Sequence, residues 1–319
     1  MKIKNINLSK NSLLEYVPIK IMSKTGKTFF SKTTKKGSSI LLSTSSNRNF
    51  ILLPSTLSLE AEDFIAIGLY FAEGEKYTNA PGISKHSGQV SIANSNVNAI
   101  KMYCNLLSKL NIPTNELHYK IGLNTNFKNV VDIEKLHDYW ISSLSLNIAK
   151  KRPKWIYFTG QIGTYRDVST SEKGFIEIYY ASTIFRGFFL NFINQLFDLC
   201  IKKAYKEELS LILKGFFAGD GCVHYSKSPR RKQIDFLNKD AILLEKIRKS
   251  LQILGLKSIK ETWPERTKAH TKSLRIYNYH DFKILERYEI VALFDYKKQI
   301  FEELMKSYVK TPDTFFKIV

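Results

Sequence analysis

Two short glycine-rich segments of the chain each end in an acidic residue followed by glycine. Ala66–Gly74 reads AIGLYFAEG and Leu213–Gly221 reads LKGFFAGDG, so Glu73 and Asp220 hold equivalent places. Both segments are helix-like, which puts each carboxylate in a last helical turn, where the helix dipole disfavours an anion by a few tenths to about 1 kcal/mol. Two carboxylates so placed predict a bound divalent cation, and oxygen ligands favour Mg²⁺ or a similar hard ion. The chemistry that they indicate is metal-assisted hydrolysis.

The small residues of these segments predict how the two acids are brought together. They lie four apart on one face of each helix: Gly68 with Ala72, and Gly215 with Gly219. Small residues at that spacing let two helix backbones approach closely, so the two motif helices are expected to pack side by side. Gly74 and Gly221 then suit the left-handed conformation that often ends a helix. The alternative is a helix pair whose acids are only solvated, and the duplication argues against it.

The segments that follow each motif are repeated as well. Gln89–Asn94 and Gln233–Asn238 alternate like strands, and each runs into an amphipathic helix. The expected buried faces of these helices are Ile100, Tyr103, Leu106, Leu107 and Leu110 in the first copy and Leu243, Leu244, Ile247, Leu251 and Leu254 in the second. Matching strands begin near Ile176 and Leu274, each followed by a further apolar helix. The pattern predicts an α+β fold of two pseudo-symmetric αββαββα repeats.

Three parts of the chain are expected on these grounds. They are a β-rich N-terminal extension at residues 1–58, a first repeat at 59–205 with an insertion at about 132–170, and a second repeat at 206–319. The extension has no acidic residue from Tyr16 to Leu59, and its basic residues there are Lys20, Lys24, Lys27, Lys32, Lys35, Lys36 and Arg48. This charge is typical of a flap on nucleic acid or of a solvated, partly mobile arm.

Composition limits the classes of protein. The 319 residues carry a net charge of +20 with a pI near 9.6, and 44% apolar and 13% aromatic content excludes a disordered basic tail. No apolar run approaches the roughly 20 residues of a membrane span, and the N-terminus lacks a signal-peptide core. Cys104, Cys200 and Cys222 are widely spaced, which suits a reducing compartment and offers no CxxC zinc pattern. The charge favours a polyanionic partner, nucleic acid first, although ribosome-associated or anionic-membrane binding stays open on charge alone.

The two motifs resemble the signature helices of LAGLIDADG homing endonucleases, and the resemblance covers about Leu59–Tyr308. A single chain with both motifs is similar to the pseudo-symmetric monomeric branch. The resemblance implies metal ligation by Glu73 and Asp220, beside Ala72 and Gly219, where the repeats meet. It implies Mg²⁺ or Mn²⁺ as cofactor and Ca²⁺ as a non-activating substitute. Position six of the motif is Phe71 and Ala218 rather than Asp, and neither the extension nor the insertion is explained.

Other site residues follow from the same resemblance. Asn94 and Asn238 stand where the family places a polar residue that orients water near the metals, and Lys203 and Lys298 resemble lysines that face the scissile phosphates. The simpler alternatives are turn chemistry before a helix for the two asparagines and solvated helix surface for the two lysines.

The resemblance also implies two antiparallel sheets that form a saddle over the major groove of double-stranded DNA. Alternation points Val90, Ile92, Ile234 and Phe236 to the helices and leaves polar residues on the exposed face. The expected base-reading set is Tyr77, Asn79, Gln89, Ser91, His224, Ser226, Arg231, Gln233, Asp235, Arg275 and Tyr277. Lys227, Arg230 and Lys232 are expected to contact phosphates. An ordinary polar sheet face is the alternative.

The sequence thus predicts a monomeric, site-specific homing endonuclease that makes a double-strand break in a long, asymmetric DNA target. We expect it in a prokaryotic cytoplasm, with the nucleoid, or in an organelle, and not at a membrane. One alternative is a LAGLIDADG-type RNA maturase or DNA-binding regulator that does not cleave. Another is a basic structural protein, such as a ribosome-associated factor, with fortuitous motifs.

Overall fold

The computed structural model describes residues 6–8, 10–22, 28–37, 39–44, 50–74, 88–124, 127, 131–144, 156–159, 173–227, 231–262 and 272–309. These residues form two compact units. The C-terminal unit holds Leu196–Val319 together with Ile67–Ala72, and the N-terminal unit holds Lys4–Ala66 and Glu73–Gln195.

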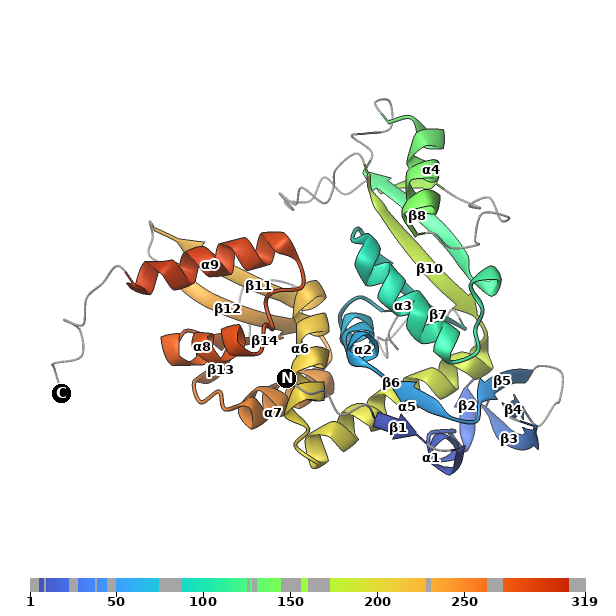
Figure 1. The fold of residues 1–319 in the computed structure, drawn as a ribbon. Helices are drawn as coiled ribbons and strands as arrows, with labels where there is room; N and C mark the ends of the chain where they lie inside the picture. Colours follow the sequence, from blue (N-terminus) through green and yellow to red (C-terminus); the bar gives the residue numbers. More distant parts are fainter. Residues whose placement is uncertain are drawn as a thin grey trace. The chain divides into compact units, whose positions relative to one another are not determined.

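The C-terminal unit is a four-stranded antiparallel sheet with helices (Figure 1). Its elements are α6 (Lys206–Asp220), β11 (Gly221–Ser226), β12 (Arg231–Asn238), α7 (Ala241–Leu254), β13 (Ile259–Thr262), β14 (Lys272–Ile276), α8 (Tyr279–Arg287) and α9 (Asp295–Val309). The strand order is β11-β12-β14-β13. Ile234 and Phe236 of β12 and the predicted apolar residues of α7 are all buried. This unit therefore has the element order predicted for the second repeat, with one helix more at its end.

The N-terminal unit contains a four-stranded mixed sheet, and two of the helices that accompany it continue into the C-terminal unit, over residues 67–72 and from residue 196. Its elements are α2 (Ala61–Glu73), β7 (Gln89–Asn94), α3 (Val97–Lys109), the 3₁₀ turn η1 (Thr114–Glu116), β8 (His118–Asn124), α4 (Ile133–Leu144), β9 (Ile156–Thr159), β10 (Phe175–Ala181) and α5 (Thr183–Lys202). The order is β7-β10-β8-β9, antiparallel except for the parallel pair β8 and β9. Strand β9 belongs to the predicted insertion, so the parallel pair is an addition to the repeated pattern.

The registers of the two sheets match where each motif helix ends. Gly74 bridges Ile92 as Gly221 pairs with Phe236, both antiparallel. Ile92 then pairs with Ile178 of β10, as Phe236 pairs with Leu274 of β14. Val90, Ile92 and the predicted face of α3 are buried. The predicted α+β fold is confirmed, and both repeat sheets are antiparallel except for strand β9 of the insertion, which pairs parallel to β8.

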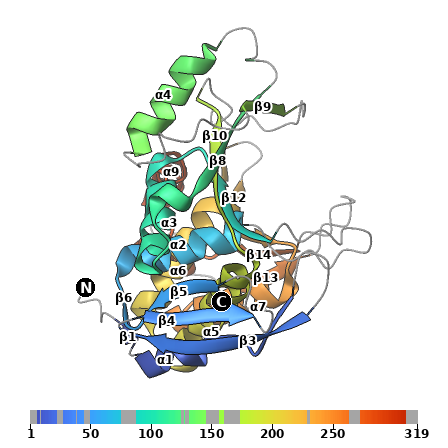
Figure 2. The ribbon, with the colours of Figure 1, turned by 90° about the vertical axis from the view of Figure 1, so that its right-hand side faces the viewer.

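The N-terminal extension adds a four-stranded antiparallel sheet to its unit (Figure 2). Its elements are β1 (Ile6–Leu8), α1 (Lys10–Glu15), β2 (Lys20–Met22), β3 (Thr28–Lys36), β4 (Ser39–Thr44), β5 (Phe50–Pro54) and β6 (Leu57–Leu59). Strands β2 to β5 pair in sequence order, and β1 pairs with β6. The extension is thus β-rich, as the alternating runs predict.

Helix α5 supplies much of the aromatic core of the N-terminal unit. Phe185, Phe188, Phe189 and Phe192 are fully buried, and the rings of Phe188 and Phe192 stack at 5.8 Å. By length and composition alone α5 is apolar enough to cross a membrane. The burial of its phenylalanines instead places it among the packed helices of this unit.

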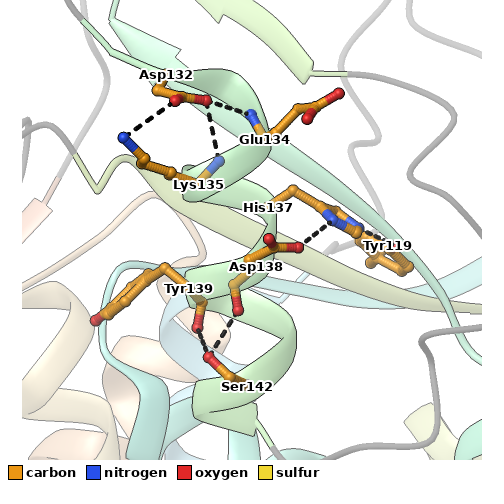
Figure 3. Close-up of polar contacts among 8 residues, drawn as sticks. All are labelled: Tyr119, Asp132, Glu134, Lys135, His137, Asp138, Tyr139 and Ser142. Atoms are coloured by element: carbon orange, nitrogen blue, oxygen red, sulfur yellow. Dashed lines mark hydrogen bonds and ion pairs between the residues drawn. The ribbon is translucent and has the colours of Figure 1, made fainter.

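Helix α4, in the predicted insertion, is held by polar contacts at its first turn and along its middle (Figure 3). The Asp132 carboxylate accepts hydrogen bonds from the amides of Glu134 and Lys135, which satisfies the first turn. The Tyr119 hydroxyl on β8 lies 3.0 Å from His137 Nε2. Buried Trp140 donates its indole N–H to the Lys173 carbonyl at 2.8 Å. The insertion therefore forms an ordered helix against β8 over residues 133–144.

The left-handed helix ends predicted for the two motif glycines are wrong. Gly221 has φ −94° and ψ 150°, an extended conformation in which the chain passes directly from α6 into β11. Gly74 bridges Ile92 in the same way. A Cβ at Gly221 would strike the ring and the carbonyl oxygen of Phe217, so close packing, rather than a positive φ, explains this glycine. The left-handed position is occupied by Gly255, with φ 109°, at the end of α7.

Candidate functional site

The last part of helix α2 lies against helix α6 within the C-terminal unit. At Gly68 a Cβ would overlap the Ile212 carbonyl oxygen and would lie 2.8 Å from the Phe216 amide nitrogen. The ring of Phe71 lies 5.4 Å from that of Phe197. Only glycine allows two backbones to approach this closely, because the contact involves main-chain atoms that cannot rotate away. The interface roles of Ala72, Gly215 and Gly219 stay predictions.

Asp220 is held at the end of α6 by an asparagine from β12. Asn238 donates its Nδ2–H to Asp220 Oδ2 at 2.6 Å, and Asn238 is only 5% exposed. The Oδ1 atom of Asn238 accepts the amide of Asp240 at 2.9 Å, so the turn role and the site role belong to the same side chain. Asp240, in turn, caps α7. A helix cap, a turn and a motif acid are thereby linked in one chain of hydrogen bonds.

The corresponding asparagine of the first repeat makes the same turn. Asn94 Oδ1 accepts the amide of Asn96 at 2.8 Å, and Asn96 caps α3 through the amides of Asn98 and Ala99. Glu73 is exposed at the end of α2, beside the bridge that joins Gly74 to the sheet. Both residues belong to the N-terminal unit.

A lysine next to the predicted one contacts the end of α6. Lys297 is 5% exposed, and its Nζ donates to the carbonyl oxygens of Phe217 at 2.9 Å, Ala218 at 2.6 Å and Gly219 at 3.3 Å. A helix C-terminus carries partial negative charge, so a buried ammonium there is stabilised and lowers the electrostatic cost of the adjacent Asp220. The sequence did contain a signal for this lysine, since Phe294, Phe301 and Leu304 predict a buried face of α9 that includes position 297.

The two predicted lysines, by contrast, are solvated. Lys203 and Lys298 are both exposed. Lys298 follows Lys297 by one residue, about 100° around the helix, and therefore faces away from the carbonyls that Lys297 contacts. The sequence-based prediction chose Lys298 for a role near the metal-binding acids and overlooked Lys297, the neighbour that faces inward.

The chemistry of the donors fits a hard divalent cation. Asp220 and Glu73 offer carboxylate oxygens at helix ends, where an uncompensated anion is disfavoured. Asp220 is partly accessible and Glu73 is exposed, so neither carboxylate is sealed inside a core. Among the described residues no group of three or more His, Cys, Asp and Glu side chains gathers in one place. A cation bound at either carboxylate would therefore need main-chain oxygens, water or substrate for its remaining positions.

A polar cluster occupies the outer side of strands β11, β12 and β14. Asp235 is 3% exposed and accepts Gln233 Nε2 at 2.5 and 2.7 Å. Its Oδ2 lies 3.2 Å from His224 Nε2, and its Oδ1 lies 3.7 Å from Arg275 Nε. The hydrogen bond that His224 donates to the Asp235 carboxylate raises the pKa of His224 to about 9, with a smaller contribution from Cys222. At neutral pH the cluster therefore contains two cations, His224 and Arg275, which both lie beside the buried carboxylate of Asp235.

The expected exposure of this face is wrong for three residues. Ser91, Gln233 and Asp235 are 5%, 4% and 3% exposed. Gln233 and Asp235 are covered because they bond to each other and to the flanking side chains. A buried carboxylate that is already saturated by donors orients its partners instead of reading a base itself.

The other predicted DNA contacts are spread over both sheets. Arg231, Lys227 and Tyr277 are exposed, and Gln89, Ser226, Lys232, His224 and Arg275 are partly exposed. Lys232 Nζ lies 3.6 Å from the ring centroid of Tyr308, a cation–π contact that fixes this lysine beside α9. Tyr77, Asn79 and Arg230 lie outside the described residues.

Comparison with known proteins gives one family match and several distant structural likenesses. Residues 207–288 match the family model described as LAGLIDADG-like domain. No curated protein matches the chain. The structure resembles mesophilic variants of the homing endonuclease I-DmoI, with a TM-score of 0.37 and 15% identity over 71% of this chain and 93% of that chain. It also resembles full-length DUF199/WhiA from Thermatoga maritima, with a TM-score of 0.40 and 12% identity over 80% of this chain and 63% of that one.

A third structure is meganuclease I-SmaMI bound to uncleaveable DNA. Its TM-score is 0.35, with 10% identity over 77% of this chain and 88% of that one. The matched residues 207–288 contain α6, Asp220 and the sheet of the C-terminal unit. The chain therefore carries a LAGLIDADG-like domain over residues 207–288, in agreement with the resemblance indicated by the second motif.

Proposed function

We propose that this protein is a metal-dependent DNA endonuclease that cuts both strands of a specific duplex site. The observation that carries the proposal is the setting of Asp220. Its carboxylate ends a motif helix, accepts a hydrogen bond from Asn238 and adjoins three carbonyls that Lys297 neutralises. A fixed carboxylate that is partly open to solvent is suited to hold a cation.

The residues have separate roles in this proposal. Asp220 and Glu73 hold the metal beside Gly219 and Ala72, and Asn238 fixes the rotamer of Asp220 while Asn94 occupies the equivalent turn. A Mg²⁺ or Mn²⁺ held by these carboxylates would supply an activated water and charge stabilisation for the leaving oxygen. One of the similar structures, of I-DmoI, is a complex with DNA and Mn.

DNA would be bound through the polar faces of the two repeat sheets. His224 and Arg275 are the base-reading candidates that Asp235 orients, and Arg231, Lys227 and Lys232 are placed beside them for phosphates. The net charge of +20 adds a salt-dependent attraction to any duplex. We infer a monomer with a long, asymmetric target, since two unlike repeats read two unlike half-sites.

The test begins with selection of cleaved molecules from a randomised duplex library with Mg²⁺. The selected target is then used with Glu73→Gln and Asp220→Asn, and with the exposed acids Glu286→Gln and Asp295→Asn as matched controls. We expect each motif variant to lose cleavage of both strands by at least about 10³-fold while it keeps specific binding, because only the metal-assisted step is removed. The control variants should cut at the wild-type rate.

Three results would sink the proposal. Wild-type cleavage by either motif variant would exclude the carboxylates as metal ligands. Specific duplex binding by the wild type without any cleavage, in Mg²⁺ or Mn²⁺, would favour a DNA-binding regulator. Binding without sequence preference would favour a basic structural protein.

A further inference from the structure

The N-terminal extension presents a sheet face that combines aromatic and basic side chains. Register places Lys20 opposite Phe30, and Lys32 in line with Ser43 and Phe50 across strands β3, β4 and β5. Phe30 and Lys32 are two residues apart on β3, so they share a face, and Leu41 pairs with Leu52 on that same side. We call Lys20, Phe30, Lys32, Phe50 and Leu52 the outer face of this sheet.

The opposite side of the sheet is anchored to the N-terminal unit. Ile21, Ile40, Leu42, Ile51 and Leu53 are at most 5% exposed. A Cβ at Gly187 of α5 would meet Ile21 at 3.1 Å, so β2 lies directly on that helix. The chain entering β2 is tied to α5 as well, because the Tyr16 carbonyl accepts Asn191 Nδ2 at 2.7 Å and the Tyr16 ring packs edge-on against Phe192 at 5.3 Å. The sheet is thus a supported platform.

The outer face leaves aromatic rings in water where folding does not require it. Phe30 is 57% exposed, Phe50 62% and Leu52 38%. In the part of the chain that the structure describes, four of the eight exposed large hydrophobic side chains lie in this sheet or directly before it, Ile19 being the fourth. Such a concentration marks a binding surface rather than scattered surface apolarity.

Charge selects the kind of ligand. Lys20 Nζ lies 5.5 Å from the centroid of the Phe30 ring, and Lys32 is exposed on the same side. No acidic residue occurs from Tyr16 to Leu59. A second copy of this face would bring lysines against lysines, which repel each other, whereas an anionic ligand would be attracted to them. Among polyanions, exposed rings favour one whose bases are free to stack.

We propose that the outer face binds single-stranded nucleic acid, with unpaired bases stacked on Phe30 and Phe50 and phosphates near Lys20 and Lys32. In a duplex the base faces are already stacked on each other, so they are not available to stack on the two exposed phenylalanine rings. Strand spacing puts the two rings about 12 Å apart, which suits bases separated by one or two nucleotides of an extended strand. This site is separate from the proposed duplex cleavage site, since it uses none of the same residues.

The test uses the full chain and labelled dT20, rU20 and a 20-base-pair random duplex at fixed salt. The variant Phe30→Ala/Phe50→Ala is compared with Ile242→Ala, which removes an apolar side chain that is 74% exposed on α7. Each stacked base contributes a factor of about five or more, so we expect the double variant to bind a single strand at least about 30-fold more weakly. Duplex binding should change less than twofold, and Ile242→Ala should change neither.

The lysines give an independent readout. For Lys20→Gln/Lys32→Gln, the slope of log binding constant against log salt should fall by about 0.7 for each lost phosphate contact on a single strand. The dT20 and rU20 arms show whether the ligand is DNA, RNA or both. Circular dichroism and the melting temperature confirm that each variant is folded.

Three outcomes would overturn the proposal. The double phenylalanine variant could bind single strands within threefold of the wild type. It could lose duplex and single-strand binding equally, which would indicate a general loss of charge or of structure. Finally, light scattering could show a wild-type dimer that the variant abolishes, which would assign the face to a second copy of the chain. Metal-dependent duplex cleavage, measured on the same variant, reports separately on the proposed endonuclease.

Discussion

Replacing Gly68 by alanine tests the contact between α2 and α6 most directly, because two effects of opposite sign compete. In an isolated helix, alanine is more favourable than glycine by about 1 kcal/mol. In this protein the new Cβ would lie 2.8 Å from the Phe216 nitrogen and 2.9 Å from the Ile212 carbonyl carbon, and closer still to the Ile212 oxygen. All three are backbone atoms of α6.

The size of the effect follows from the separation that alanine would force. Ordinary contact at about 3.5 Å requires the helices to move apart by at least about 0.6 Å, and such a gap already forfeits a quarter or more of each dispersion contact across the interface. Buried Ile212, Phe216 and Leu69 all lie along this contact region or beside it. Overpacking typically costs about 1–3 kcal/mol, and the upper end applies here because the blocking atoms belong to a backbone. After the gain of about 1 kcal/mol in helix propensity, we expect Gly68→Ala to lower the free energy of unfolding by about 2 kcal/mol.

The assay is urea unfolding followed by far-UV circular dichroism, with Gly187→Ala as the matched control. Gly187 is also helical, but the three atoms nearest to its Cβ would all be side-chain atoms of Ile21, the closest at 3.1 Å, and none of them is a backbone atom. That variant should stay within about 1 kcal/mol of the wild type. Stabilisation of the protein by Gly68→Ala would refute the close approach of the two backbones.

Two further predictions concern the C-terminal unit. Lys297→Met leaves three carbonyls of α6 without their charged donor and should lower the free energy of unfolding by about 2–4 kcal/mol. The control Lys298→Met, at an exposed position, should change it by less than about 0.5 kcal/mol. Equal effects of the two variants in urea unfolding would contradict the capping role of Lys297. The pKa of His224 is raised to about 9 by Asp235, above its ordinary value of 6.5, so the folded state holds a proton that the unfolded state releases. Stability from this pair is fully present below about pH 6.5 and is lost as the pH rises to about 9, by about 1–2 kcal/mol because the ring is partly solvated. His224→Gln should flatten this dependence in unfolding measurements at pH 6 and pH 9.5, and an unchanged slope would argue against the pairing.

Much of the local structure follows from the sequence because backbone geometry imposes periods on it. The three- and four-residue spacing of Ile100, Tyr103 and Leu107 predicts a helix face, and these residues are buried. Alternation points Ile234 and Phe236 inward, and the structure agrees. The duplicated motif likewise predicts the α+β class, since repeated patterns fold into repeated units.

What the sequence leaves open are choices between near-equivalent neighbours and contacts distant along the chain. Lys297 and Lys298 are chemically identical, and only the position of the α6 carbonyls decides which one is buried. The extended conformation of Gly221 depends on the ring of Phe217 and on the strand that pairs with it. Asp235 lies on the polar side of its strand, yet it is buried because His224 and Arg275 from neighbouring strands close over it.

The sequence by itself determined the two motifs with their acids, the faces of helices and strands, and a charge that calls for a polyanion. Tertiary structure alone decided which polar side chains hold Asp220, which lysine caps its helix, and which aromatic rings remain in water. The physical reason is one of range. Periodicity and charge are properties of neighbouring residues, whereas burial and hydrogen-bond partners are set by packing between elements that the chain brings together only when it folds.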